Sequence, residues 1–341
     1  MSEKAKIWCI LTQPGLDRVM RPEHQAKLAA EFDVTFNKKG TMPDTDAIAR
    51  KIADYDVLLG GWGTPPLTSK VFNKAPKLKL YCHLAGSVKG ILSPEVVDEC
   101  LVPRGIVTFS ANEAIAYNVA ESTIGLMLML SHRWLPFVND FRATGRWRHG
   151  DIPWNGQFLQ GATVGIIGAS KVGRHVMKLL TGWDLKLLCY DPYLDAREAR
   201  KLGVRKVSLE DLFRTADFVT LHTPSVPETD RMVNERLLKL MKDGATFINT
   251  ARGNAVDHEA LLAEARTGRI LVGLDVTDPE PLPPDSPFRE LQNVYITPHV
   301  SGAGYYGYFK IGEMGLRAIK DCLSGKRVKG AVPYERYAQL A

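Results

Sequence analysis

The chain has 341 residues, more than one hydrophobic core usually serves, so two domains are expected. Apolar residues make up 45% and charged residues 24%, which is typical of a globular enzyme, and we expect no apolar run near the roughly 20 residues that cross a bilayer and no membrane partner. The formal net charge of +6 is scattered in short runs, which argues against a nucleic-acid partner and favours a pocket for an anionic substrate.

The cysteines are odd in number and none lies close to another in the sequence. Such spacing fits neither a disulfide framework nor a zinc site, so we expect reduced core thiols and no metal. The first residues lead directly into a strand-like segment, without the pattern of a secretory signal. Both observations favour the cytoplasm. The five cysteines are Cys9, Cys82, Cys100, Cys189 and Cys322.

The first hundred residues alternate short apolar runs with helical stretches. This alternation predicts βα units and a parallel sheet. A long apolar-periodic stretch over 114–133 then predicts one helix. The expected strands of this first series are 6–11, 55–60, 78–84 and 106–109.

A second alternating series follows and predicts one complete doubly wound sheet. Ser208 has the features of a helix N-cap, with Asp211 three residues later. The last helical segment, 303–323, is expected to return to the first series, because that series is too short for a large domain. We therefore predict a domain formed by 1–111 with 304–341, and a nucleotide-binding domain over 112–303. The expected strands of the second series are 163–168, 185–190, 218–222, 246–250, 270–276 and 295–297.

The segment GIIGASKVG at 165–173 follows an apolar strand and opens a helix. Gly168 would form the tight turn, Gly173 would allow close packing of helix on strand, and the helix N-terminus would face a pyrophosphate. Ser170 stands where the middle glycine of the dinucleotide-binding pattern is usual. Its hydroxyl could donate to a phosphate oxygen, or the loop could lie slightly further back.

Asp191 closes the next strand, about 18 residues beyond Gly173, near the spacing of a carboxylate that accepts from the ribose hydroxyls. Pro192 and Tyr193 follow it, with no cation to receive a 2′-phosphate, so NAD is favoured over NADP. The alternative is an ordinary βα turn followed by an ordinary acid at a strand end.

Three further segments place a polar residue at the end of a strand, where open α/β sheets carry their sites. They are 249–253 with Arg252, 274–281 with Glu280, and 297–302 with His299. Arginine, carboxylate and histidine together suit the reduction of a 2-oxo acid.

With these motifs, the chain resembles the D-isomer-specific 2-hydroxyacid dehydrogenase family over nearly its whole length. The resemblance rests on the order of the motifs at 165–173, 190–192, 221–224, 249–253, 275–281 and 297–299. It implies two α/β domains, each a doubly wound parallel sheet: a Rossmann NAD-binding domain and a smaller, flavodoxin-like substrate domain built from both termini.

The resemblance implies the catalytic roles. Arg252 would hold the substrate carboxylate with its planar fork. His299 would act as general acid in reduction and as base in oxidation. Glu280, preferred over Asp278 because the motif runs through Glu280-Pro281, would orient His299 and favour its charged form.

Further residues are expected around the cofactor and the substrate. His222 ends a strand and is expected to line the cofactor pocket. The loop 84–90 would offer backbone N–H groups to the substrate carboxylate, although it departs from the family pattern at Leu92-Ser93. The resemblance places these residues at the cofactor: Lys171, Val172, Thr223, Pro224, Thr229, Thr250, Ala251 and Asp275. The substrate candidates are Ser87 and Val88 as donors, Lys89 as a charge or a plain surface lysine, and Trp62 as a wall or a core residue.

Several alternatives stay open. The family usually forms dimers through the region around Trp134, Trp147 and Trp154, so a homodimer is expected. A non-enzymatic, NAD-responsive binding protein similar to corepressors would share this plan. So would a phosphonate dehydrogenase, whose loop Lys89-Gly90 resembles. The sequence does not select the 2-oxo acid.

Overall fold

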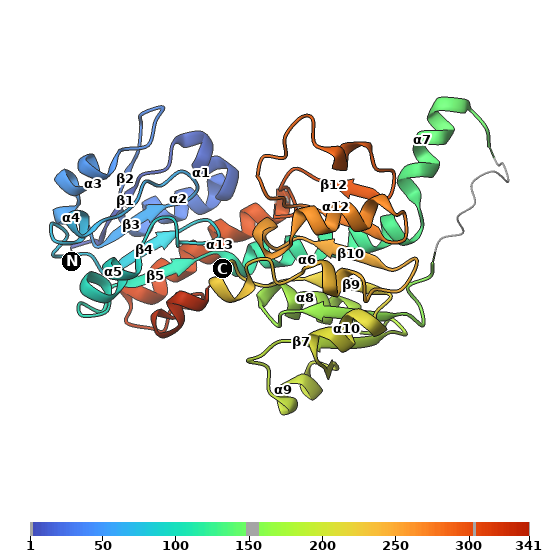
Figure 1. The fold of residues 1–341 in the computed structure, drawn as a ribbon. Coiled ribbons are helices and arrows are strands. Elements are labelled where there is room, and N and C mark those ends of the chain that lie inside the picture. Colours follow the sequence, from blue (N-terminus) through green and yellow to red (C-terminus); the bar gives the residue numbers. More distant parts are fainter. Residues whose placement is uncertain (1–2, 148–156, 303–304, 341) are drawn as a thin grey trace. The chain divides into compact units, whose positions relative to one another are not determined.

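The structure is a computed structural model that describes residues 3–147, 157–302 and 305–340 (Figure 1). The chain divides into two compact units. The terminal unit consists of Met1–Ile115 with Ala303–Ala341, and the central unit consists of Ala116–Gly302. Each unit is an α/β fold built on one parallel sheet, as predicted.

The terminal unit has a five-stranded sheet in the order β2-β1-β3-β4-β5, with every pair parallel. This is the order of the flavodoxin-like doubly wound fold that was predicted. Its strands are β1 (Lys6–Cys9), β2 (Asp33–Phe36), β3 (Val57–Gly60), β4 (Leu80–His83) and β5 (Val107–Ser110). Its helices are α1 (Gln13–Val19), α2 (Pro22–Glu31), α3 (Thr45–Lys51), α4 (Ser69–Phe72), α5 (Pro94–Val96) and α13 (Tyr305–Leu323).

Alternating side chains of these strands supply two separate cores. Leu59 and Cys82 face α1, α2 and α13, while their neighbours Leu58 and Tyr81 face α3, α4 and the turn that follows α5. Successive strand residues point to opposite faces, so a sheet with continuous apolar strands needs helices on both sides. The C-terminal helix α13 packs on α1 and β4, as the predicted return of the chain requires (Figure 1).

The central unit has a seven-stranded parallel sheet in the order β12-β11-β10-β9-β6-β7-β8. The order reverses at β6, as in a Rossmann fold, and the predicted fold class is confirmed. Its strands are β6 (Thr163–Ile167), β7 (Lys186–Tyr190), β8 (Arg205–Lys206), β9 (Phe218–Leu221), β10 (Thr246–Asn249), β11 (Leu271–Leu274) and β12 (Val294–Ile296). Its helices are α7 (Trp134–Thr144), α8 (Lys171–Leu180), α9 (Ala196–Lys201), α10 (Leu209–Thr215), α11 (Glu235–Leu238) and α12 (His258–Arg266).

Two strands, β2 and β8, escaped prediction. Both lie at an edge of their sheet, and β8 consists of two exposed residues, Arg205 and Lys206. An edge strand is less buried than a central strand, so it lacks the continuous apolar run by which a strand is predicted. By contrast, the predicted cap of α10 is confirmed, because the Ser208 hydroxyl accepts a hydrogen bond from the Asp211 amide at 3.1 Å.

The long helix α6 (Asn112–Ser131) confirms the helix predicted over 114–133. Among the described residues it has the length and apolar composition of a membrane-crossing segment, so the expectation of no apolar run near that length was wrong. Half of this stretch is buried inside the protein. Ala120, Met127 and Leu130 pack into the core beneath β6 and β10, which accounts for its apolar character.

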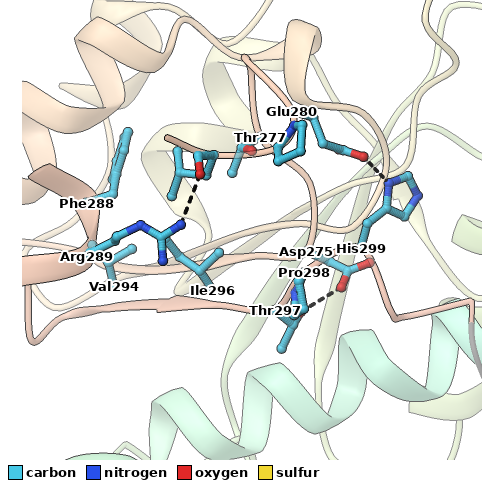
Figure 2. A pocket seen from close by; sticks show the side chains of 12 residues that line it. Asp275, Thr277, Glu280, Phe288, Arg289, Val294, Ile296, Thr297, Pro298 and His299 are labelled. Carbon is cyan, nitrogen blue, oxygen red and sulfur yellow. Dashed lines mark hydrogen bonds and ion pairs between the residues drawn. The ribbon is translucent and has the colours of Figure 1, made fainter. Parts of the chain in front are cut away.

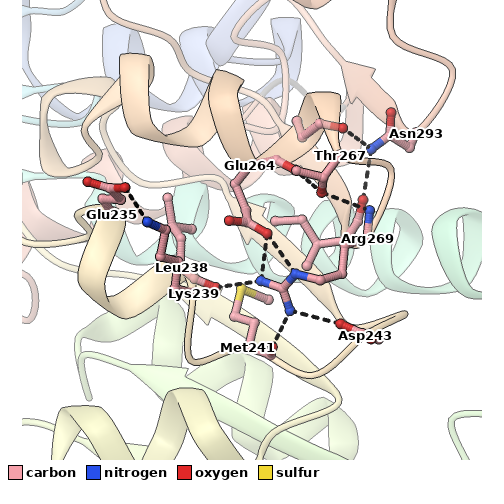
Figure 3. A network of polar contacts seen from close by, with 11 residues as sticks. Glu235, Leu238, Lys239, Met241, Asp243, Glu264, Thr267, Arg269 and Asn293 are labelled. Atoms are coloured by element: carbon pink, nitrogen blue, oxygen red, sulfur yellow. Dashed lines mark hydrogen bonds and ion pairs between the residues drawn. The ribbon is translucent and has the colours of Figure 1, made fainter.

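A network of polar contacts around Arg269 lies at the amino ends of the strands of the central unit (Figure 3). Arg269 pairs with the buried carboxylate of Glu264 at 2.6 Å and with Asp243 at 3.2 Å, and it donates to the carbonyl oxygens of Leu238 and Met241. One guanidinium thus joins α11, α12 and the loop before β10. We attribute to it a structural role, because it lies at the amino ends of the strands, away from the predicted site residues.

Candidate active site

The glycine-rich loop between β6 and α8 requires glycine at two of its positions. Gly168 has φ +94°, and a Cβ atom there would lie 2.8 Å from the His222 carbonyl oxygen. A Cβ atom on Gly173 would lie 2.1 Å from the Gly168 carbonyl oxygen. Because Gly168 has no side chain, the ends of β6 and β9 can lie side by side. Because Gly173 has none, α8 can begin directly after the turn.

Ser170 occupies the middle position without strain. It is the N-cap of α8, with extended backbone angles, and its hydroxyl oxygen accepts from the Gly173 amide at 3.3 Å. The backbone therefore does not need glycine here, and the serine side chain caps the helix instead. Arg174 adds a restraint that the sequence did not reveal, since it donates to the Ala169 carbonyl and pairs with Glu198 at 2.7 Å.

Asp191 ties the ends of β6 and β7 together. One carboxylate oxygen accepts from the Ala169 amide at 2.7 Å, and the other accepts from the amides of Tyr193 and Leu194. The predicted ribose acceptor is thus also a fixed part of the loop framework. The amides in the first turn of α8 have no intrahelical acceptor, so this end of the sheet presents N–H groups suited to an anion.

Two buried polar atoms without partners lie at the end of β9, against the glycine loop. His222 Nδ1 and Thr223 Oγ1 have no hydrogen bond among the described residues. His222 Nε2 lies 3.0 Å from the Thr220 hydroxyl, and burial lowers the pKa of His222 to about 3, so its ring is neutral. Unsatisfied buried groups are costly, so two of them beside a glycine cradle fit a ligand that supplies the missing partners.

The other predicted cofactor residues include two that hold the backbone. Thr229 Oγ1 donates to the Pro224 carbonyl at 2.7 Å and accepts from the Val226 amide, which closes the loop after β9. Thr250 Oγ1 lies 2.9 Å from the Thr123 hydroxyl and joins the end of β10 to α6.

A tight turn after β10 carries Arg252. Asn249 shapes it with both ends of its amide: Nδ2 donates to the Arg252 carbonyl at 2.8 Å, and Oδ1 accepts from the Ala251 amide at 2.9 Å. Gly253 lets the turn approach the neighbouring loop, because a Cβ atom there would lie 2.0 Å from the Thr277 carbonyl oxygen. Asn249 and Gly253 stand inside the predicted motif, but their roles appear only in the structure.

The loop that carries His299 is fixed by Asp275. The Asp275 carboxylate accepts from the Thr297 hydroxyl at 2.6 Å and from the amides of Val300 and Ser301 at 2.9 and 3.0 Å. The Asp275 carbonyl oxygen also accepts from the His299 amide at 2.8 Å. His299 itself has a left-handed backbone, φ +53°, an uncommon conformation that these four bonds maintain.

Glu280 and His299 face each other directly (Figure 2). His299 Nδ1 and Glu280 Oε1 are 2.6 Å apart. Because a carboxylate only accepts, Nδ1–H donates, and Nε2 is the ring nitrogen left for chemistry. Arg252 belongs to the same cluster: burial lowers the pKa of its guanidinium, and the negative charge of Glu280 opposes this shift.

His258 supports the Glu280 loop, a role the sequence did not predict. Its Nε2 accepts from the Asp278 amide at 3.2 Å, and its Nδ1 lies 3.1 Å from the Val256 carbonyl oxygen. Burial lowers the pKa of His258, which favours this neutral tautomer. No motif marks His258, because its partner is 20 residues away.

A cavity of about 620 Å³ adjoins the pair on the side of the 277–298 loop. Glu280, His299 and Asp275 form one end of it, and Phe288 and Arg289 line the other (Figure 2). Neither Arg252 nor the glycine loop lines this cavity, so it extends behind the pair rather than along the cofactor cradle.

The predicted substrate residues lie at the carboxyl ends of the strands of the terminal unit. After β4 the chain turns tightly: the Val88 carbonyl accepts from the amides of Ile91 and Leu92, and Ser87 Oγ accepts from the Lys89 amide at 3.3 Å. The Lys89 ammonium donates to the Ala338 carbonyl at 3.0 Å.

Trp62 is 46% exposed, so its reading as a core residue was wrong. Its ring meets Tyr308 edge-on at 5.4 Å. Together with Thr12 and Arg18 it lines a cavity of about 250 Å³ in the terminal unit.

Comparison with known families decides the identity of the chain. The NAD binding domain of D-isomer specific 2-hydroxyacid dehydrogenases matches residues 124–301. The chain belongs to the D-isomer specific 2-hydroxyacid dehydrogenase family. It is an NAD-dependent dehydrogenase that acts on CH–OH donors, and the predictions of family, cofactor and enzyme class are confirmed.

Named relatives of this dehydrogenase include a glyoxylate reductase and a D-3-phosphoglycerate dehydrogenase. The glyoxylate reductase of Korarchaeum cryptofilum is 30% identical over 85% of this chain and 86% of its own length. The D-3-phosphoglycerate dehydrogenase of Methanocaldococcus jannaschii is 33% identical over 94% of this chain, which spans 61% of that longer protein. A phosphoglycerate oxidoreductase from Rhizobium etli has the same fold, with a TM-score of 0.83 at 24% identity over 98% of this chain and 99% of its own.

Proposed function

We propose that this dehydrogenase interconverts a small 2-oxo acid and its D-2-hydroxy acid, with Arg252, Glu280 and His299 as the catalytic set. The observation that carries the proposal is the 2.6 Å contact between Glu280 and His299, beside an arginine whose pKa responds to the same carboxylate. A carboxylate-bound imidazole supplies a proton, and a nearby guanidinium supplies a carboxylate site.

In the direction of reduction, His299 begins as an imidazolium. Its Nδ1–H remains hydrogen-bonded to Glu280, so the proton given to the substrate carbonyl oxygen leaves from Nε2. NADH, held by the glycine loop between β6 and α8, would supply the hydride that completes the alcohol. In oxidation His299 starts neutral, and Nε2 takes the hydroxyl proton.

Arg252 binds the substrate. Its Nη1 donates to the Ala251 carbonyl at 2.6 Å, which fixes the plane of the fork and leaves other N–H donors for the substrate carboxylate. Asn249, Asp275 and His258 act as positioning residues, because each holds a backbone segment that carries one member of the catalytic set.

We assign the NAD site to the central unit and the cofactor-binding domain to residues 112–303. Gly168 and Gly173 would shape the loop, Asp191 would accept from a ribose hydroxyl, and the unpaired atoms of His222 and Thr223 would complete their hydrogen bonds with the cofactor or its bound water. The remaining contacts would come from Ser170, Lys171, Val172, Pro224, Thr229, Thr250, Ala251 and Asp275.

The predicted substrate domain, residues 1–111 with 304–341, lies within the terminal unit and would bind the rest of the substrate. The amides of Ser87 and Val88 would meet its carboxylate, with Lys89 at the margin of the loop. Trp62 would bound the substrate side chain, since it walls a small cavity. That cavity favours a compact acid, such as the glyoxylate reduced by the relative from Korarchaeum cryptofilum.

We further propose a homodimer in a reducing compartment such as the cytoplasm. Helix α7 exposes Trp134, Phe137 and Phe141, and Trp147 beyond it is 83% exposed. Such an apolar surface is typical of an interface. Trp154, the third tryptophan of the prediction, lies outside the described residues. All five cysteines are free thiols.

The test is NADH oxidation by purified protein on a panel of 2-oxo acids, with His299→Ala and Arg252→Lys as variants. We expect turnover on compact acids, loss of turnover in His299→Ala, and a raised KM in Arg252→Lys, because lysine cannot form the bidentate contact. Binding of NADH without turnover on any acid would favour the corepressor-like alternative. Reduction of NAD⁺ by phosphite, with no turnover on any 2-oxo acid, would favour the phosphonate dehydrogenase.

A further inference from the structure

The terminal unit contains a second, larger cleft of about 810 Å³. It is formed where β4 and β5 begin, by Lys79, Arg104 and the segment 325–331 that follows α13. The candidate substrate loop 84–90 follows the opposite end of β4. Because the strands are parallel, the cleft and that loop lie at opposite edges of the sheet, separated by the full length of β4, about 13 Å.

Five cations and, in the part of the chain that the structure describes, no acidic residue line the cleft. The whole chain has a net charge of +6, and five of its cations gather in this one hollow. Like charges in a concave, low-dielectric surface focus the field and attract anions. The cations that line the cleft are Lys79, Arg104, Lys326, Arg327 and Lys329.

Most of this charge is not neutralised within the protein. Lys79 pairs with Asp56 at 2.9 Å. Among residues 3–147, 157–302 and 305–340, no carboxylate forms an ion pair with Arg104, Lys326, Arg327 or Lys329. The four charges therefore repel one another in the free protein, and a bound anion would relieve that repulsion.

The fold also fixes one of these side chains, that of Arg104, and the backbone of the segment that carries Lys329. The Arg104 guanidinium donates to the carbonyl oxygens of Phe72 and Ala75, which fix its orientation without cancelling its charge. The segment that carries Lys329 is bonded to β5, because the Gly330 carbonyl accepts from the Ser110 amide at 3.2 Å. A site whose groups are fixed beforehand loses less entropy on binding.

A purely structural role for these cations, capping the C-terminus of α13, does not account for them. The amides of Ser324, Gly325 and Lys326 already donate to carbonyl oxygens in the last turns of that helix. No hydrogen bond joins the side chains of Lys326 or Arg327 to the helix in the described part of the chain. Cap satisfaction therefore does not need them.

We propose that this cleft binds a small polyanion, a compound with two or more phosphate or carboxylate groups, apart from the catalytic loops. Its volume lies within the range of small-molecule sites. A nucleic acid would instead need an extended basic stripe. In the sequence, helix α13 lies between His299 and the segment 325–331 that lines the cleft. Turnover is therefore worth measuring together with occupancy of the cleft.

The test is calorimetric titration of inorganic tripolyphosphate into the full chain with saturating NADH, which blocks the pyrophosphate site. We expect one tripolyphosphate per chain and weaker binding as salt rises. The double variant Arg327→Gln/Lys329→Gln should bind at least about tenfold more weakly. The control Lys38→Gln/Lys39→Gln removes two exposed charges of the same unit outside the cleft, and it should bind within about twofold of the parent chain.

Citrate and a short DNA duplex complete the experiment. Citrate that competes with tripolyphosphate supports the site as a general polyanion site. No detectable binding of tripolyphosphate, equal weakening in both double variants, or a duplex that binds more tightly than tripolyphosphate and loses affinity equally in both variants would overturn the proposal. NADH binding and turnover on 2-oxo acids are measured on the same samples, so failure of the cleft is distinguishable from failure of the proposed dehydrogenase site.

Discussion

Gly253→Ala tests whether the close approach of two loops positions the catalytic set. The added Cβ atom would lie 2.0 Å from the Thr277 carbonyl oxygen and 2.8 Å from the Asp278 amide nitrogen. Ordinary contact begins at 3.4 Å, so the Arg252 turn and the Glu280 loop must separate by about 1.4 Å. Both neighbours are backbone, so no side-chain rotation relieves the clash.

A displacement of about 1 Å in an active site lowers turnover about 100-fold. We expect kcat/KM of Gly253→Ala to fall by about that factor and the NADH dissociation constant to change much less, because the glycine loop that would bind the pyrophosphate follows β6 and not β10. Steady-state NADH oxidation and NADH fluorescence titration measure the two quantities.

Two variants control this result. Gly40→Ala has open space around the added atom and should be neutral. Asn249→Ala removes both hydrogen bonds that close the Arg252 turn and should reproduce the selective loss. If Gly253→Ala kept kcat/KM within threefold of the parent chain, the positioning argument would be refuted.

Three further predictions concern residues that the structure singles out. Burial lowers the pKa of His83 to about 4 and that of His222 to about 3, so below about pH 6.5 these histidines take up protons in the unfolded chain and stay neutral in the folded one. Each histidine should therefore lower the free energy of unfolding by about 2 kcal/mol between pH 7 and pH 5. Equal urea midpoints at the two pH values would contradict this. His258→Leu removes the acceptor of the Asp278 amide and should lower kcat about tenfold, with the NADH dissociation constant unchanged, and His258→Gln should restore part of the loss. Ser170→Gly should change stability by only a few tenths of a kcal/mol and Ser170→Ala by about 1 kcal/mol, whereas tight NADH binding only in the glycine variant would show that the serine obstructs the cofactor.

The sequence predicted the fold well wherever strands are buried on both faces. The runs around β6, β9 and β10 are continuous and apolar because helices cover both sides of the sheet. The edge strands β2 and β8 carry no such run and were missed. The pattern of apolar residues reflects burial, so strands with little burial cannot be predicted from it.

The proposed catalytic residues could be named from the sequence because each follows a buried strand within a recognisable motif. The residues that position them were not. His258 and Asp278 meet across 20 residues, and Asp275, expected at the cofactor, turns its carboxylate to the His299 loop. Such contacts depend on how loops from neighbouring strands pack. The basic cleft is similar, because Lys79, Arg104 and Lys329 meet only in the folded terminal unit.

The most direct test of the catalytic account is a double-mutant cycle between Glu280 and His299. If Glu280 acts through the imidazole, Glu280→Gln lowers kcat in the parent chain and has no further effect in His299→Ala, which itself loses about 100-fold or more. Single-turnover NADH oxidation in the four proteins gives the coupling. Independent losses that multiply in the double variant would contradict the account, because Glu280 would then act on the substrate without His299.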